Sequence, residues 1–376
     1  MVLTAADTRT TEEQGVTAAV ERPRNDTLTP PGIGWRHRLQ ASVDRLVVDR
    51  LRPEELLFGV FVIALTVLVA ITGQWHVVGH RLVAGLRFVA IVLGVALILF
   101  VRAYLSERRT VPNRRARVAT SLRVALQTLR GFGPLFACLA IYEALHDLTP
   151  ILRPHVDDQW LVDSDHFFLH VDVGRWLDDH IGSALTTHVL TWCYVSYAFA
   201  SPIYAGYQYV KANYRPFHDF ALAITITAFI GYSGYLLVPA VGPYVFQHNL
   251  YADRLQGWGH GGILDIIAKM KGSARDAFPS LHTAMTTVVL GCMWRDARKL
   301  FWTYLPIALG LYLATMYLRV HYATDVAAGF VVGALALHLT PKINKWWYGR
   351  NVRAAVGLTA DAHIPSPRQP DSVELV

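Results

Sequence analysis

The sequence predicts an all-α membrane protein, a polytopic helix bundle, and two observations on composition lead to this fold class. Hydrophobic residues make up 53% of the 376-residue chain and charged residues only 17%, a more apolar balance than is usual for soluble domains. The apolar residues also form long runs, such as ELLFGVFVIALTVLVAIT from Glu55 and PIALGLYLATMYL from Pro306. Runs of this length are typical of membrane-spanning helices.

The apolar runs predict about eight spans of roughly 20 residues each. They lie near residues 55–72, 84–103, 124–145, 187–209, 219–240, 279–295, 301–318 and 323–340.

The connectors between the spans indicate the orientation of the chain. Lys and Arg concentrate in alternate connectors, of which ERRTVPNRRARVATSLR, from Glu107, is the most basic. The positive-inside rule therefore predicts that both termini lie in the cytoplasm and that the other loops lie outside. The formal net charge of +7 follows from this topology, so no nucleic-acid partner is expected.

Composition divides the chain into four parts. Residues 1–35 and 354–376 are polar and lack an apolar core, so we expect disordered cytoplasmic tails. Residues 36–123 hold two N-terminal spans and a basic loop, and residues 124–341 hold the other six spans. The sequence sets no oligomeric state.

The sequence gives no sign of a metal or cofactor. Cys138, Cys193 and Cys292 all fall in apolar segments, and an odd number without paired spacing indicates neither a disulfide framework nor a zinc site. The outer segment 146–182 mixes aromatic residues with many aspartates, a pattern suited to helices in the membrane interface. We interpret its acids as solvated side chains rather than metal ligands.

A first candidate motif follows the seventh predicted span. In YLRVHYATD, His321 and Asp325 are four residues apart, so a helix starting here would place both on one face within hydrogen-bonding reach. A carboxylate in this position fixes the tautomer of an imidazole and stabilises its cation.

A second motif, SARDAFPSLHTAMTT, predicts another helix start on the same membrane side. Pro279 suits the first turn, Asp276 or Ser280 can cap it, and His282 falls within it. A helix N-terminus favours anions. Four cations lie near it in sequence or topology, namely Arg275, Arg319, Lys269 and Lys271. Two histidines, a carboxylate and several cations at one membrane face indicate a site for a phosphoryl group.

Each motif alone occurs often by chance. The alternative to a phosphoryl-group site is that these ionisable residues line the pathway of a transporter or channel. Glu143, late in its span, fits a pathway, but the chain lacks the internal repeat expected of many transporters.

FPSLH, followed by HYATDVAAG, resembles the type 2 phosphatidic acid phosphatase superfamily, and GYSGYLLVPAVGPY is similar to its inositol phosphorylceramide synthase-like branch with bacterial members. The resemblance covers about Gly131 to Leu339 and implies a six-helix catalytic core, without a metal or cofactor. It implies that His321 is the nucleophile that forms a phosphohistidine, Asp325 its orienting partner and His282 the acid.

The resemblance also implies how the phosphate is bound, with two departures from the phosphatase pattern. Ala314 and Thr315 stand where the phosphatases have Ser-Arg, so Arg319 is expected to supply that charge. Lys211, before Arg215 and Pro216, is the only partial match to the other phosphatase motif and lies on the predicted cytoplasmic side. In its place we expect a phosphate-binding set of Arg275, Ser280, Arg319, Gly242 and Tyr244.

The function implied is a lipid phosphotransferase, inositolphosphotransferase-like, acting on a phospholipid or lipid phosphate at the outer face of a bacterial plasma membrane. A simple lipid phosphate or polyprenyl phosphate phosphatase is the alternative, because water can also resolve a phosphohistidine.

Overall fold

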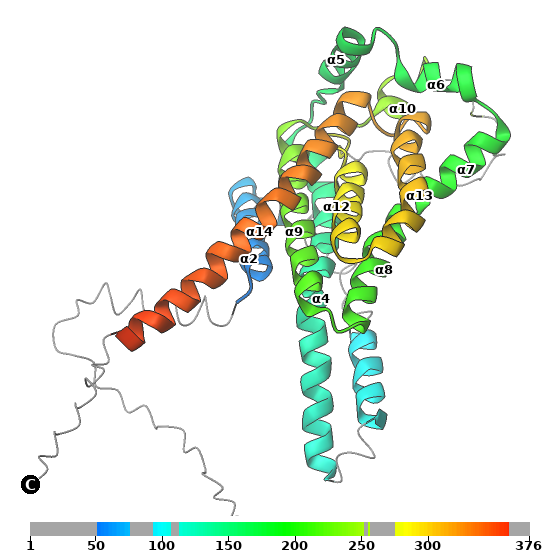
Figure 1. Ribbon diagram of the computed structural model, residues 1–376. Coiled ribbons are helices and arrows are strands. Elements are labelled where there is room, and N and C mark those ends of the chain that lie inside the picture. The colour runs from blue at the N-terminus through cyan, green and yellow to red at the C-terminus, as the bar shows by residue number, and fades with distance from the viewer. Residues whose placement is uncertain (1–50, 76–92, 107–112, 252–254, 256–274, 361–376) are drawn as a thin grey trace, which may run out of the picture.

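The computed structural model describes residues 51–75, 93–106, 113–251, 255 and 275–360 (Figure 1). Throughout these residues the regular structure is helical and contains no strand, which confirms the predicted all-α fold. Five of the described helices are long and apolar enough to cross a membrane. They are α2 (Pro53–Thr72), α4 (Arg114–Leu152), α9 (Tyr214–Leu237), α13 (Arg298–Tyr317) and, as far as Gly349, α14 (Ala323–Ala360).

The span expected at 187–209 is divided into two helices. These are α7 (Ala184–Val195) and α8 (Tyr197–Val210), which meet at Ser196. Ser196 Oγ donates to the carbonyl of Cys193 at 2.6 Å, and hydroxyl groups that bond to nearby carbonyls compete with the regular helical hydrogen bonds.

Two other predicted spans are only partly matched by a long helix. The span at 279–295 is the 16-residue helix α12 (Leu281–Asp296), which at 1.5 Å per residue covers about 24 Å, less than a ~30 Å hydrocarbon core. The span at 84–103 overlaps the helix Leu93–Ser106, and its earlier part lies outside the described residues.

Three short helices lie at one end of the bundle (Figure 1). They are α5 (Asp158–Leu169), α6 (Val173–Ile181) and α10 (Pro243–Phe246). The C-terminal ends of α4, α9 and α13 and the first turns of α12 and α14 reach the same end. The segment in which we expected interface helices therefore forms the last turns of α4, followed by α5 and α6.

Helix α12 packs against α8, α9, α13 and α14, and two glycines allow its close contact with α14. Gly329 and Gly333 form a Gly-x-x-x-Gly pair on α14. A Cβ on Gly329 would lie 2.5 Å from the carbonyl oxygen of Ser280, and one on Gly333 would lie 2.6 Å from that of Ala284. Small residues at this spacing let two membrane helices approach at backbone distance. The start of α12 is thereby held against the first turns of α14.

The N-terminal helix α2 packs on α4 and α9. The ring of Phe61 lies 5.3 Å from that of Phe229, and Arg130 Nε lies 2.5 Å from Glu55 Oε1. The predicted tail 1–35 lies outside the described residues. Helix α14 continues to Ala360, past residue 354, where the second predicted tail begins.

Candidate active site

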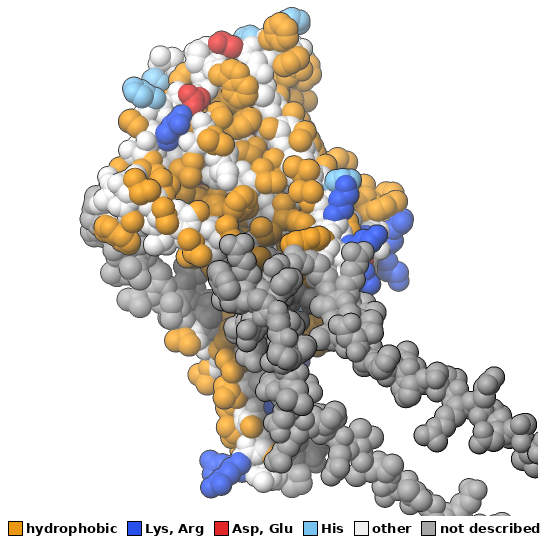
Figure 2. Space-filling view, turned by 90° about the vertical axis from the view of Figure 1, so that its left-hand side faces the viewer, with side chains coloured by type: hydrophobic (Ala, Val, Ile, Leu, Met, Phe, Trp, Pro, Cys, Tyr) orange, Lys and Arg blue, Asp and Glu red, His pale blue; other side chains and the backbone are white. Residues whose placement is uncertain are grey.

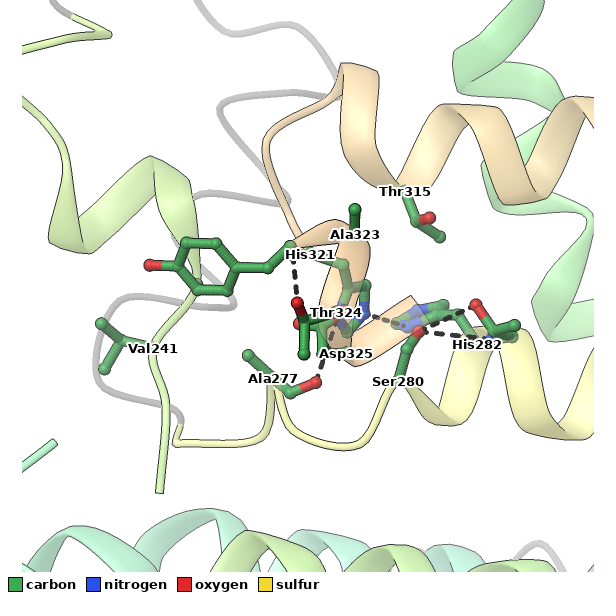
Figure 3. Close-up of polar contacts among 12 residues, drawn as sticks. Val241, Ala277, Ser280, His282, Thr315, His321, Ala323, Thr324 and Asp325 are labelled. Atoms are coloured by element: carbon green, nitrogen blue, oxygen red, sulfur yellow. Dashed lines mark hydrogen bonds and ion pairs between the residues drawn. The ribbon is translucent and has the colours of Figure 1, made fainter. Parts of the chain in front are cut away.

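The two histidines of the separate motifs meet at the end of the bundle that carries α5, α6 and α10. His282 lies in the first turn of α12, and His321 lies in the loop between α13 and α14 (Figure 3). His282 Nδ1 is 3.0 Å from His321 Nε2. A sequence separation of 39 residues is therefore closed to hydrogen-bonding distance by the packing of α12 on α14.

The other nitrogen of His321 faces two acceptors. His321 Nδ1 is 3.1 Å from the carbonyl oxygen of Ala277 and 3.2 Å from Asp325 Oδ2. A carbonyl oxygen can only accept a hydrogen bond, so Nδ1 carries the proton. In the neutral ring Nε2 then holds the lone pair, and His282 Nδ1 donates to it.

His321 and Asp325 meet although His321 precedes the helix, which begins at Ala323. The N–H groups of Val320 and His321 both donate to the carbonyl of Thr315 at 3.0 Å and so fold the loop back onto α13. The N–H of Tyr322 donates to Asp325 Oδ2 at 3.1 Å. His321 and Asp325 are 2% and 0% exposed, so their contact is shielded from solvent.

Two tyrosines hold the ring of His282. Tyr194 stacks on it with ring centroids 4.8 Å apart, and Tyr197 lies at 4.4 Å. Both come from the α7–α8 region, on either side of the break at Ser196. The break therefore places two aromatic rings at one histidine.

Ser280 is the N-cap of α12, one of the two caps that the sequence allowed. Its Oγ accepts from the N–H of Thr283 at 3.3 Å, and its own N–H donates to the carbonyl of Asp325 at 3.1 Å. Asp276 is not the cap, because α12 begins only at Leu281, and its carboxylate instead accepts a hydrogen bond from Tyr142 Oη at 2.5 Å. Ser280 thus joins the two histidine-bearing segments directly.

Arg319 is buried beside the histidine loop and contacts α6. Its Nη2 lies 2.8 Å from Asp178 Oδ2, and its guanidinium lies over the ring of Tyr251, 4.5 Å from the centroid. Its backbone has a φ of 62°, which is uncommon for a residue with a side chain. A strained arginine at 2% exposure, two positions before His321, is consistent with a functional role.

The structure places Arg275 at the end of α4. Its Nη1 donates to the carbonyl of Pro150 at 2.9 Å and to that of Arg153, where a helix C-terminus favours positive charge. Lys269 and Lys271 lie outside the described residues. Lys211 lies at the far end of α9, whose 24 residues separate it from the histidines by about 36 Å of helix.

Gly242 and Tyr244 meet the histidine loop through the backbone. Gly242 has a φ of 88°, and a Cβ there would lie 2.5 Å from the carbonyl oxygen of Val320. Tyr244 N–H donates to the carbonyl of Arg319 at 2.8 Å, while its side chain is 44% exposed. The turn that contains them therefore supports the loop before His321.

Two acids on α5 were interpreted from the sequence as solvated, and this was wrong. Asp158 and Asp165 are 0% and 6% exposed. Burial raises the pKa of Asp158, although hydrogen bonds from the N–H groups of Val241 and Gly242 oppose the rise. The seven-residue spacing, which puts both on one helix face, was the available sequence signal. Among the described residues no group of three or more His, Cys, Asp or Glu is arranged to hold a metal ion.

Two comparisons with known proteins bear on this site, and no solved structure matches the chain. A PA-phosphatase related-family protein of Dictyostelium discoideum is 30% identical over 182 residues, which make up 43% of this chain and 33% of that protein. The chain thus spans about a third of that relative's length. Residues 159–339 match the family model of the PAP2 superfamily. This region extends from α5 into α14 and includes both histidines and Asp325, so the two matches together support a PAP2 superfamily domain in this chain.

Proposed function

We propose that this protein is an integral membrane lipid phosphotransferase that works through a phosphohistidine on His321. One observation carries the proposal. The Nδ1 of His321 is held by Ala277 and Asp325, while its Nε2 faces His282 at 3.0 Å. The orienting carboxylate of Asp325, the nucleophile His321 and the proton donor His282 are thus linked by consecutive hydrogen bonds.

In the first step, His321 Nε2 attacks the phosphorus atom and the bond from phosphorus to the leaving alcohol oxygen breaks. His282 enters this step as the imidazolium, and the alcohol oxygen takes the proton from its Nδ1, which leaves His282 neutral. Asp325 stabilises the positive charge that develops on the His321 ring. Because the two nitrogens are 3.0 Å apart, they separate as the phosphoryl group enters between them.

In the second step, the oxygen of an acceptor hydroxyl attacks the phosphorus and the bond to Nε2 breaks. The acceptor's proton passes to the now neutral His282. Transfer to a second alcohol and hydrolysis by water use the same residues, so the acceptor alone decides between them.

We place the phosphoryl oxygens at the start of α12, where the first N–H groups and Ser280 favour an anion. Arg319 completes the proposed phosphate-binding set. Arg275, Gly242 and Tyr244 are proposed to support this set from outside, because Arg275 donates to the end of α4 and the N–H groups of Gly242 and Tyr244 donate to Asp158 and to the carbonyl of Arg319. Arg319 binds the phosphate while it keeps its ion pair with Asp178, because a guanidinium has more N–H groups than one carboxylate accepts.

We further propose that the site faces the outside, with the six spans of 124–341 as the catalytic unit. Figure 2 shows acidic and histidine side chains at one end of the visible face, broad apolar surface between, and Lys and Arg mainly toward the other end. Helix α5 exposes Phe167 and Phe168 by 73% and 71%, as suits a helix in the membrane interface.

Cysteine labelling tests this orientation. In a variant without the three native cysteines, a cysteine at the exposed position Asp163 of α5 is expected to react in intact cells with an impermeant maleimide. One at Asn213, between α8 and α9, should react only after lysis, because the positive-inside rule puts that loop in the cytoplasm. The reverse pattern would turn the site toward the cytoplasm. The loop around Gly261, also expected on the outside, lies outside the described residues.

Transfer is favoured over hydrolysis because Ala314 and Thr315 depart from the phosphatase pattern and because VGPY resembles the inositolphosphotransferase-like branch. The matched Dictyostelium protein is described as PA-phosphatase related, and this favours the second candidate, a lipid phosphate or polyprenyl phosphate phosphatase.

Product analysis separates the two candidates. The purified protein is incubated with labelled phospholipids, with or without diacylglycerol, ceramide or inositol as acceptor. We expect a new phosphodiester lipid that forms only with an acceptor and is absent with His321→Ala. Release of inorganic phosphate from a lipid monophosphate, unaffected by any acceptor, would show a phosphatase instead.

A further inference from the structure

Helix α5 crosses the same end of the bundle as the histidines (Figure 1) and directs two buried carboxylates toward their segments. Asp158 and Asp165 are two helical turns apart on one face of α5. Both are part of a 12-residue helix. A third acid of this helix, Asp163, is exposed and accepts a hydrogen bond from Gln159 Nε2 at 2.8 Å, within the same helix.

Asp165 binds the first turn of α14. Its two oxygens accept from the N–H groups of Ala323 and Thr324, each at 2.8 Å, and Oδ1 also accepts from Thr324 Oγ1 at 2.6 Å. The first N–H groups of a helix have no partner within the helix. A side chain from another helix, more than 150 residues earlier, therefore caps the helix that carries Asp325.

Asp158 binds two further segments near His321, namely the turn at Val241 and Gly242 and the side chain of Tyr322. Its Oδ2 accepts from the N–H of Val241 at 2.9 Å, and its Oδ1 accepts from the N–H of Gly242 at 2.8 Å. Oδ1 also accepts from Tyr322 Oη at 2.9 Å. Tyr322 is the residue after His321. Gly242 lies close to Val320, the residue before His321, since a Cβ on Gly242 would be 2.5 Å from the Val320 carbonyl oxygen. Asp158 thus fixes the loop on both sides of His321.

We propose that α5 is a clamp on the His321–Asp325 loop and that Asp158 and Asp165 are positioning residues for catalysis. The inference rests on the proposed function, since it takes His321 as the nucleophile. Neither aspartate is placed at the reacting atoms. Asp165 acts through the N–H groups of Ala323 and Thr324, and Asp158 acts through the hydroxyl of Tyr322 and the turn that holds Gly242. Displacement of a reacting group by about 1 Å can cost a factor of ~100 in rate, so loss of either clamp is expected to slow turnover.

The test compares Asp165→Ala and Asp158→Ala with the control Asp163→Ala, which removes an exposed acid from the same helix. Hydrogen exchange in detergent should become faster at the amides of Ala323 and Thr324 in the first variant and at those of Val241 and Gly242 in the second. The control should exchange as wild type does. If an alanine variant does not fold, the corresponding asparagine variant, which keeps one acceptor oxygen, is measured instead.

Kinetics separate positioning from general loss of structure. We expect kcat to fall about 10- to 100-fold in each variant, with KM for the phosphoryl donor within about twofold of wild type. Turnover should fall at acid pH as the nucleophile His321 becomes protonated. In Asp165→Ala this acid limb of the kcat profile should move to lower pH, because a looser Asp325 contact stabilises the His321 imidazolium less. A merely structural defect would lower the active fraction and leave this limb in place.

The hydrogen-exchange measurement and the kinetic measurement test the proposal independently of each other. Unchanged exchange at the four amides, or faster exchange with wild-type kcat and an unmoved pH profile, would overturn the clamp. Exchange needs no substrate, so faster exchange in a chain whose wild type transfers no phosphoryl group would contradict the proposed function and leave the clamp's contacts standing.

Discussion

Replacement of His321 by alanine is expected to reduce turnover by at least about four orders of magnitude, as is typical when the nucleophile of a covalent mechanism is lost. No described neighbour can substitute for it, because the carbonyl of Ala277 is not a nucleophile and the nearest ring nitrogen, on His282, is the proposed acid. The measurement is product formation per mole of purified, folded protein. His338→Ala is the matched control, because His338 is exposed and bonds Lys342 on α14.

Asp325→Asn tests the same arrangement more finely. The Oδ2 of Asp325 accepts from both the Tyr322 N–H and His321 Nδ1. An asparagine oxygen in the Oδ2 position can keep both hydrogen bonds, but the negative charge of the carboxylate is lost. The positive charge that develops on the His321 ring during attack is then stabilised less, so we expect a loss of about 10²- to 10⁴-fold. Near-wild-type turnover of His321→Ala would remove His321 from the mechanism, and near-wild-type turnover of Asp325→Asn would remove Asp325 as its orienting partner.

The sequence predicts the fold class well because membrane helices are specified by length and apolarity, which are local properties. It does not predict where a helix divides, because nothing in the apolar run 187–209 marks the break at Ser196 between α7 and α8. Nor did the apolar runs indicate that Gly329 and Gly333 bring α14 against the backbone of α12. Small residues have this effect only when the partner helix is known.

The candidate site was predictable in its centre but not in its surroundings. His282, His321 and Asp325 could be chosen because each stands at a predicted helix start on one membrane face. The groups that the two arginines contact could not be predicted from the sequence, because they lie on helices distant in the chain. Arg275 binds the end of α4, and Arg319 binds Asp178 on α6. Buried and solvated aspartates look alike in a polar loop, so the roles of Asp158 and Asp165 emerge only from the packing of α5.

His282→Ala should produce a loss that depends on the leaving group, because the proposed role of this residue is to protonate the departing alcohol. With an ordinary lipid or polyol ester we expect a reduction of about 10²- to 10⁴-fold, the usual range for general acid catalysis. With a p-nitrophenyl ester of the same phosphoryl group, the first step needs no proton, so one equivalent of p-nitrophenol should still be released rapidly.

The second step should then stall in His282→Ala, because the base that accepts the acceptor's proton is missing. Phosphohistidine on His321 should accumulate after the burst and be detectable by mass spectrometry of the intact chain. Tyr194→Phe is the matched control, since it keeps the ring that stacks on His282 at 4.8 Å and removes only a hydroxyl, so both substrates should react at near wild-type rates. If the first step were slowed equally with both substrates, with no burst of p-nitrophenol, His282 would not be the acid. In that case the 3.0 Å contact between the two rings would serve to position His321, and the proton for the leaving alcohol would have to come from another group.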